Sequence, residues 1–227
     1  MKALVLFSGG VDSSTCLGMA VSRYGAENVV ALSVQYGQKH EKEVEAAEKI
    51  ARYYNVELVR LDLTPIFAFS DCPLLKQSEQ EIPRESYAEQ IAATEGGPVS
   101  TYVPFRNGLF LSSAASVSLS KGCSVILYGA HSDDAAGSAY PDCSEAFNDA
   151  MSRAIYEGSG GQLRVEAPFV GMSKADVVRT GLSLEVPYQY TWSCYEGGEH
   201  PCGVCATCID RARAFELNGV TDPALEK

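Results

Sequence analysis

The sequence lacks any apolar stretch of the roughly 18 residues that a membrane-spanning helix requires. Its beginning also lacks the apolar segment and small-residue cleavage site of a secretory signal peptide, because a glycine follows within a few residues of Met1 and Lys2. We therefore expect a soluble cytoplasmic protein that does not associate with membranes.

Positive charge is also scarce. The chain has 18 lysines and arginines against 29 aspartates and glutamates, which gives a formal net charge of -11 at pH 7. An acidic surface repels the phosphates of nucleic acids, and no basic tail offsets it. The composition thus argues against a DNA or tRNA substrate, and we expect no nucleic-acid partner.

Internal repeats and low-complexity tracts are absent too, and the 227 residues fit one α/β domain with a small appendage. Apolar runs that indicate strands cover residues 2–7, 28–35, 57–63, 124–129 and 163–167. Patterns that indicate helices cover residues 14–24, 39–54, 106–120, 142–157, 173–184 and 209–217. This alternation predicts a doubly wound parallel sheet with helices on both faces. Residues 64–100 lack periodicity and predict a long excursion with short helices.

The first expected strand runs into residues 8–13, which read SGGVDS. The two glycines allow a tight turn and a close approach of ligand to backbone, and the serine hydroxyls can donate to phosphate oxygens. The following helix directs its free N–H groups and its dipole at the same place. The loop has neither the lysine of a Walker motif nor the spacing of a dinucleotide fingerprint. It predicts an anion-binding site at the carboxyl end of a central strand.

Asp12 is the unexpected residue in this loop, because a carboxylate repels phosphate. A bridging Mg²⁺ resolves the conflict, and so does capping of local backbone N–H groups. A strand–turn–helix connection that is simply capped by Asp or Ser is the alternative without a ligand.

The stretch resembles the pyrophosphatase-loop family of ATP-using enzymes, whose signature is S-G-G-x-D-S. The resemblance implies cleavage of ATP between the α and β phosphates and transfer of AMP to a substrate oxygen. It implies catalytic roles for Ser8, Asp12 and Ser13. The residues expected to bind ATP with Mg²⁺ are Phe7, Ser8, Gly9, Gly10, Val11, Asp12, Ser13, Ser14, Thr15, Cys16 and Leu17.

Four of the eight cysteines cluster near the carboxyl end as C-x7-C-x2-C-x2-C, namely Cys194, Cys202, Cys205 and Cys208. Four thiolates and no open position predict a structural metal site with one Zn²⁺ per chain. An iron–sulfur cluster, His200 in place of Cys194, and four free thiols are the alternatives. The four scattered cysteines indicate ordinary core thiols. We expect an ATP-binding domain over residues 1–188 and a zinc-binding segment with a last helix over residues 189–227.

Five further segments narrow the family: QYGQKHE at 35–41, TYVPFRN at 101–107, GAHSD at 129–133, YPDC at 140–143 and WSCY at 192–195. In this order, over nearly the whole chain, they resemble the 7-cyano-7-deazaguanine synthase family. That resemblance implies an adenine nucleotide alpha hydrolase-like fold, structural zinc and a homodimer. It also implies ATP-dependent conversion of 7-carboxy-7-deazaguanine and ammonia to the nitrile of queuosine biosynthesis, through an adenylated carboxylate and an amide.

The chain departs from that family at two points. Phe105 stands where glycine is frequent, and residues 130–134 differ from the frequent V-C-E-T-D. Both lie where we place the substrate.

Arg106 and His131 are the further residues to which we assign catalytic roles. Arg106 offers a planar cation for a phosphate or carboxylate, or it is a helix N-terminal arginine without such a role. Asn107 is expected to bind substrate, with capping of its helix as the alternative. His131 follows a strand and is either a general base or a plain hydrogen-bonding group.

Two more polar residues have two interpretations each, and a third has one. Asp133 can accept two N–H donors from a guanine-like edge, or it can cap a loop. Asp142 is interpreted as the N-cap of its helix. Lys174 either neutralises phosphate or is a solvated lysine early in a helix.

Two rival functions remain on the residues alone. Another pyrophosphatase-loop enzyme, such as a tRNA thiolase or a tRNA lysidine-type ligase, would be expected to show basic patches or an added RNA domain. A non-catalytic zinc module whose loop binds nucleotide for regulation would bind ATP without turnover.

Overall fold

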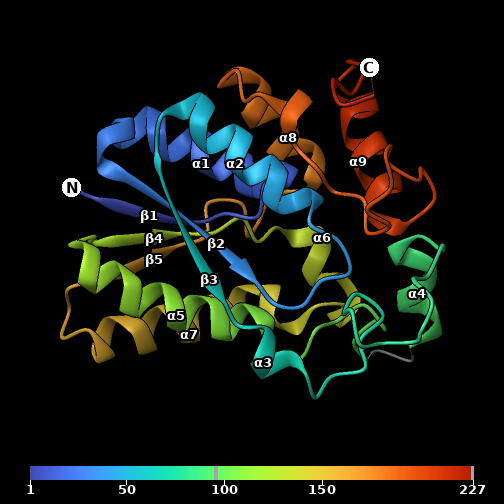
Figure 1. The fold of residues 1–227 in the computed structure, drawn as a ribbon, viewed down its shortest axis with the longest axis horizontal. Coiled ribbons are helices and arrows are strands. Elements are labelled where there is room, and N and C mark those ends of the chain that lie inside the picture. Colours follow the sequence, from blue (N-terminus) through green and yellow to red (C-terminus); the bar gives the residue numbers. More distant parts are fainter. Residues whose placement is uncertain (95–96, 226–227) are drawn as a thin grey trace.

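The computed structural model describes residues 1–94 and 97–225. Over this part of the chain, five parallel strands form one sheet in the order β3-β2-β1-β4-β5 (Figure 1). Their bounds are β1 Ala3–Leu6, β2 Val29–Gln35, β3 Glu57–Asp62, β4 Val125–Leu127 and β5 Arg164–Glu166. The central strand β1 pairs Ala3 with Val29 of β2 on one side and with Val125 of β4 on the other. Because the strand order reverses beside β1, the loops after β1 and β4 flank the crevice where such sheets bind ligands.

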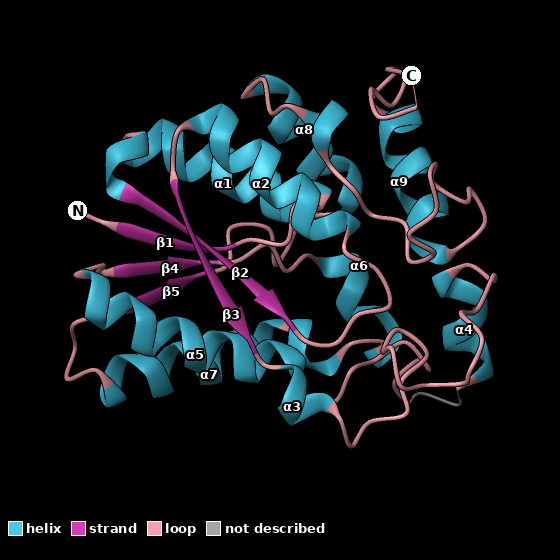
Figure 2. Ribbon diagram, viewed as in Figure 1, coloured by secondary structure: helices cyan, strands magenta, loops and turns pink. Residues whose placement is uncertain are grey.

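Helices cover both faces of this sheet (Figure 2), which confirms the predicted doubly wound α/β fold. Helices α1, α2 and α8 lie on one face and α5 and α7 on the other. The α-helices are α1 Val11–Tyr24, α2 Lys42–Tyr54, α3 Thr64–Phe67, α4 Tyr87–Ala93, α5 Arg106–Lys121, α6 Ser132–Ala135, α7 Glu145–Gly158, α8 Lys174–Ser183 and α9 Ala206–Leu217. Short 3₁₀ turns cover Ala26–Asn28, Ala136–Ser138, Pro141–Cys143 and Tyr188–Tyr190.

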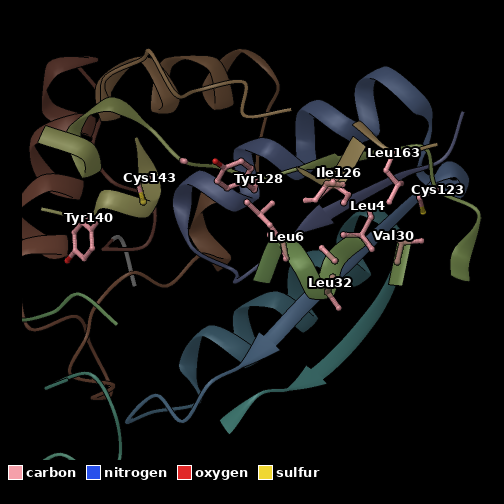
Figure 3. Close-up of a cluster of buried hydrophobic side chains, with 14 of the residues drawn as sticks. Leu4, Leu6, Val30, Leu32, Cys123, Ile126, Tyr128, Tyr140, Cys143 and Leu163 are labelled. Carbon is pink, nitrogen blue, oxygen red and sulfur yellow. The ribbon is translucent and has the colours of Figure 1, made fainter. Parts of the chain in front are cut away.

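The core follows the two-residue period of the strands. Leu4 and Leu6 of β1 point to the side of α5 and α7, where they pack with Leu32 and Ile126 (Figure 3). The intervening side chains point to α1, α2 and α8 and form a second cluster. Both faces of the central strands are therefore apolar, as expected for a parallel sheet that is covered on both sides.

Several helix ends differ from the sequence prediction. Helix α1 begins at Val11 rather than at residue 14, so Asp12 lies in its first turn. Helix α7 begins only at Glu145, and its N-cap is Ser144, whose Oγ accepts the N–H of Phe147 at 3.1 Å. The interpretation of Asp142 as that N-cap was wrong, because Asp142 lies in the preceding 3₁₀ turn.

Other ends match or shift in informative ways. Ser173 caps α8 as predicted, in a capping box with Asp176. Helix α9 begins at Ala206, three residues earlier than expected. Helix α5 follows Phe105, which has a left-handed backbone with φ 55°, so the alternative of Asn107 as its N-cap was wrong.

The excursion and the carboxyl-terminal segment meet at the carboxyl ends of the strands. The excursion carries α3 and α4, as expected, and Tyr87 of α4 hydrogen-bonds Tyr195 through their hydroxyls at 2.6 Å. Val178 of α8 packs against Phe215 of α9, with Tyr188 in the same cluster. None of the helices in the described ranges is both long and apolar enough to span a membrane.

Candidate active site

The loop at residues 8–13 connects β1 to α1, and its hydroxyls are already ordered by the loop itself. Ser8 and Ser13 approach each other at 3.1 Å between their Oγ atoms. The N–H of Gly10 donates to Ser8 Oγ at 3.2 Å, and the N–H of Ser8 donates to Ser13 Oγ at 3.2 Å. Gly10 precedes the first helical residue and no side chain caps α1. The first turn of α1 therefore offers uncapped N–H groups beside two hydroxyls, which suits an anion.

Gly9 is required by the packing of this loop. Its φ is +88°, and a Cβ at this position would lie 2.6 Å from the backbone nitrogen of Ala47 and 2.6 Å from the carbonyl oxygen of Glu43. Helix α2 thus rests directly on the loop backbone. No side chain fits here without a shift of either backbone.

Asp12 pairs with a lysine from a distant part of the chain. Its Oδ2 accepts a hydrogen bond from Nζ of Lys174, and Lys174 is the first residue of α8. Its Oδ1 lies 3.8 Å from His131 Nε2 and accepts no hydrogen bond within the described residues. The loop after β4 approaches closely because it has Gly129, where a Cβ would come within 3.0 Å of Asp12 backbone carbon.

Burial of Asp12 would by itself raise the pKa of its carboxyl group. The positive charge and hydrogen bond of Lys174, together with the nearby His131, outweigh burial and hold the pKa below its ordinary value of 3.8. Asp12 is therefore ionised at neutral pH, and one of its oxygens is free to bind a cation.

A cavity of about 240 Å³ joins this loop to α5. Arg106, the first residue of α5, extends into it and donates from Nη1 to the hydroxyl of Tyr36 at 3.3 Å. The guanidinium carbon also lies 5.1 Å from the centroid of the Tyr36 ring. Burial lowers the pKa of Arg106. The nearby Tyr36, Tyr195 and Asp142 together raise it by more than burial lowers it, so the net shift of the pKa is upward. The cavity therefore contains a fixed positive charge.

The predicted site residues fall into two groups. Those that line the cavity are Phe7, Ser8, Gly10, Val11, Asp12, Ser13, Arg106, Asn107 and His131. Asn107 is held by Asp142, whose Oδ2 accepts the N–H of Asn107 at 2.8 Å. Lys174, for which phosphate neutralisation was one interpretation, also lines the cavity.

The other predicted residues lie outside the cavity wall. Ser14, Thr15, Cys16 and Leu17 are fully buried in or beneath α1. Asp133 accepts the N–H of Lys174 on its Oδ2 at 2.7 Å, which agrees with the capping interpretation.

Sequence reasoning assigned no role to several other residues of the cavity wall, among them Tyr36, Glu43, Cys143 and Tyr195. Tyr36, Cys143 and Tyr195 lie in segments that narrowed the family, and Glu43 lies two residues after one of them. Tyr36 and Glu43 lie at the two ends of the connection from β2 to α2. Strand β2 is a neighbour of β1, so this connection lies at the same edge of the sheet as the loop at residues 8–13. A rule that assigns such connections to the site would have found them.

The four clustered cysteines come together as predicted. Their Sγ atoms all lie within 4.8 Å of one another. Tetrahedral zinc–thiolate bonds of about 2.3 Å place sulfurs somewhat less than 4 Å apart, and Cys202 and Cys208 Sγ are separated by 4.0 Å. The group therefore has the composition and spacing of a metal site.

Backbone groups surround these sulfurs. Cys194 Sγ accepts the N–H of Cys202 at 3.3 Å and that of Glu196 at 3.4 Å. Cys202 Sγ accepts the N–H of Cys205 at 3.3 Å. Donors of this kind stabilise thiolates, as a metal site requires. The segment also reaches the loop at residues 8–13, because the N–H of Trp192 donates to the carbonyl of Gly9 at 3.0 Å.

Comparison with known proteins identifies the family. The family model described as queuosine biosynthesis protein QueC matches residues 2–219. The 7-cyano-7-deazaguanine synthase of Archaeoglobus fulgidus is 44% identical over 226 residues, which are 99% of this chain and 90% of the relative. The synthase of the same name from Oceanobacillus iheyensis is 38% identical over 224 residues, 98% of this chain and 96% of the relative.

A solved structure shares the fold. It is the U34-tRNA thiolase NcsA from Methanococcus maripaludis with its 4Fe-4S cluster, with a TM-score of 0.50 and 16% identity. The match covers 96% of this chain and 66% of the thiolase chain. The relatives that match over nearly the full length are named as synthases, so the chain is an enzyme. It belongs to the family of the queuosine biosynthesis protein QueC.

Proposed function

We propose that this enzyme converts 7-carboxy-7-deazaguanine and ammonia to 7-cyano-7-deazaguanine with ATP, as a carbon–nitrogen ligase of queuosine biosynthesis. The observation that supports this most is the match to the QueC family over residues 2–219. The geometry agrees with it, because one cavity contacts both the loop at residues 8–13 and the half-buried cation of Arg106. Such a cavity can hold a triphosphate and a carboxylate against each other.

The proposed chemistry activates the two carboxylate oxygens in turn. A carboxylate oxygen attacks the α-phosphorus of ATP and pyrophosphate leaves, and ammonia then displaces AMP to give the amide. The amide oxygen is activated in the same way, and loss of AMP gives the nitrile. The protein contributes position and charge neutralisation. Ser8, Ser13 and the start of α1 would bind phosphate, and Arg106 would orient the carboxylate.

The residues present fit Mg²⁺ beside the nucleotide. Asp12 Oδ1 is a buried, ionised oxygen that accepts no hydrogen bond within the described residues, and hard cations prefer such oxygens. Bound Mg²⁺ would supply positive charge to the phosphates. Lys174 would remain as a second cation on the other oxygen of Asp12.

We propose one structural Zn²⁺ per chain at the four-cysteine group. All four positions of a tetrahedron would be taken by thiolates, so the ion would stabilise the segment and bind no substrate. We further propose that residues 1–188 form the ATP-binding domain and that residues 189–227 form the zinc-binding segment.

The experiment that tests the function supplies ATP, Mg²⁺, ammonium and 7-carboxy-7-deazaguanine and detects the amide and nitrile by mass spectrometry. Both products are expected, with AMP and pyrophosphate, and neither should form when ATP or ammonium is omitted. Asp12→Ala and Ser8→Ala should nearly abolish turnover with the fold retained, whereas Ser120→Ala at the exposed end of α5 should not. Absence of both products from the wild-type enzyme, or full activity in both loop variants, would reject the proposal.

A further inference from the structure

The mechanism above does not use Glu43, a half-buried carboxyl group of the cavity wall. Glu43 lies in the first turn of α2 and lines the cavity together with Ser8 and Gly10 of the loop and Arg106. Its backbone position is fixed, because its carbonyl oxygen faces Gly9 at a distance that admits no Cβ. Within the described residues its side chain makes no hydrogen bond and has no cationic partner within 4.0 Å.

Other acidic groups near the cavity are already engaged. Asp12 pairs with Lys174, and Asp142 accepts the N–H of Asn107. Arg106, a fixed cation in the wall, donates to Tyr36. The Glu43 carboxylate thus shares the cavity with the proposed nucleotide loop and the proposed substrate cation, with its lone pairs available.

We propose that Glu43 is a catalytic residue that accepts the proton from the substrate nitrogen when the nitrile forms. This inference rests on the proposed function. In the activated amide, the carbon carries the AMP oxygen and is doubly bonded to an N–H nitrogen. The C–O bond breaks, and its electron pair leaves with AMP. The N–H bond breaks, and its pair becomes the third C–N bond. The proton goes to a carboxylate oxygen of Glu43.

The ionisation of Glu43 suits this role. Burial raises the pKa of its carboxyl group to about 7, although the charge of Arg106 opposes the shift. A base is most effective when its pKa lies near the operating pH. Apart from Glu43, the charged or titratable residues that line the cavity are Asp12, Tyr36, Tyr87, Arg106, Tyr128, His131, Tyr140, Cys143, Lys174, Tyr195 and Asp210.

The test compares Glu43→Gln and Glu43→Asp with the wild-type enzyme, using the amide of 7-carboxy-7-deazaguanine and ATP as substrates. Glu43→Gln should lower nitrile formation by about 10²- to 10⁴-fold. It should leave amide-dependent exchange of labelled pyrophosphate into ATP within about threefold, because activation of the amide oxygen precedes loss of the proton. Glu43→Asp keeps the base and should retain more nitrile formation than Glu43→Gln. Glu45→Gln, on the exposed face of the same helix, is the matched control and should be unchanged.

The pH profile separates Glu43 from other bases. Because the carboxylate form is required, wild-type nitrile formation should rise as pH increases through about 7, and Glu43→Gln should lose this limb. A rise with an unchanged midpoint in Glu43→Gln would assign the titration to another group and overturn the inference. Loss of pyrophosphate exchange in parallel with nitrile formation would also overturn it.

Failure of the two proposals gives different results. If the wild-type enzyme converts the amide to the nitrile and Glu43→Gln does so at the same rate, only the role of Glu43 is rejected. If the wild-type enzyme forms no nitrile from either the acid or the amide, the proposed function is rejected, and the inference is rejected with it.

Discussion

At the scale of single residues, Asp12 depends on a lysine 162 positions away in the chain. Its side chain and that of Lys174 are 24% and 16% exposed, so water screens their interaction only in part. The ionised carboxylate beside the proposed phosphate site is therefore stabilised by α8, which lies outside the loop motif. The pair would bring one anion and one cation to the triphosphate.

Lys174→Met should impair both activity and stability. We expect kcat/KM to fall by about 10²- to 10³-fold, because a cation at the phosphates is lost. In the wild type, Asp12 has a folded-state pKa below 3.8, so its ionisation contributes stability above pH 3.8 that is lost as pH falls through the folded value. In the variant, burial would raise that pKa instead, so ionisation would destabilise the fold as pH rises.

The deficit in the free energy of unfolding should therefore be larger at pH 7, at about 2 kcal/mol, than at pH 4. Denaturant unfolding at both values measures it. Lys49→Met on α2 is the exposed control and should change neither activity nor stability appreciably. Equal deficits at the two pH values would show that Lys174 does not control the ionisation of Asp12.

Gly9 and Gly10 are adjacent but should respond differently to alanine. At Gly9 a Cβ meets two backbone atoms at 2.6 Å and φ is +88°, so Gly9→Ala should lower the free energy of unfolding by about 2 kcal/mol or more. At Gly10 φ is -78° and the nearest atom to a Cβ is Ser8 Oγ at 3.4 Å, so Gly10→Ala should cost under about 1 kcal/mol. Thermal unfolding of the two variants decides the point, and equal losses would contradict the packing argument.

At the scale of elements, the sequence predicted those features that depend on residues close together in the chain. The order of strands and helices follows from apolar runs, and the start of α8 follows from Ser173, whose partner Asp176 is only three residues away. The start of α1 was missed because Asp12 and Ser13 are typical of turns, whereas here they occupy its first turn. The residues of the 8–13 loop were found because six consecutive residues make the motif.

Contacts between distant segments could not be predicted in the same way. Asp142 binds the start of α5 rather than α7, because two separate loops meet at the carboxyl ends of the strands. Glu43 carries no motif of its own, and only the packing of α2 on Gly9 places it at the cavity. The left-handed backbone of Phe105 explains why glycine would suit this position, since glycine adopts this conformation readily.

The carboxyl-terminal metal segment should respond to loss of a single thiol. Cys205→Ser removes one ligand, and we expect it to lower the free energy of unfolding by several kcal/mol when zinc is present. Chelation of the wild type should lower its melting temperature in the same direction. Cys123→Ser in the core is the matched control for loss of a buried thiol and should leave the zinc content unchanged. A melting temperature that does not change after complete removal of metal would argue against a structural role.

At the scale of the whole molecule, the residues around the four cysteines contact the preceding part of the chain at two places. Trp192 donates its backbone N–H to Gly9 in the loop. At the second place, Arg211 of α9 pairs with Asp222 through two hydrogen bonds of 2.6 and 2.8 Å and donates to the carbonyl of Tyr188 at 3.4 Å. The four-cysteine group and the loop at residues 8–13 are therefore parts of one packed structure.

Asp222→Asn tests this attachment, because it leaves the guanidinium of Arg211 buried without its carboxylate. Both side chains are under 10% exposed, at 7% and 4%, so we expect a loss of about 3 kcal/mol in the free energy of unfolding. Arg23→Gln breaks the exposed pair with Glu166, where the side chains are 46% and 37% exposed, and should cost less than about 1 kcal/mol. Because α9 begins beside Cys205 and contains Cys208, Asp222→Asn should also release metal to a chelator faster than either the wild type or Arg23→Gln. Matched metal-release rates in all three proteins would show that the ion pair does not support the cysteine group.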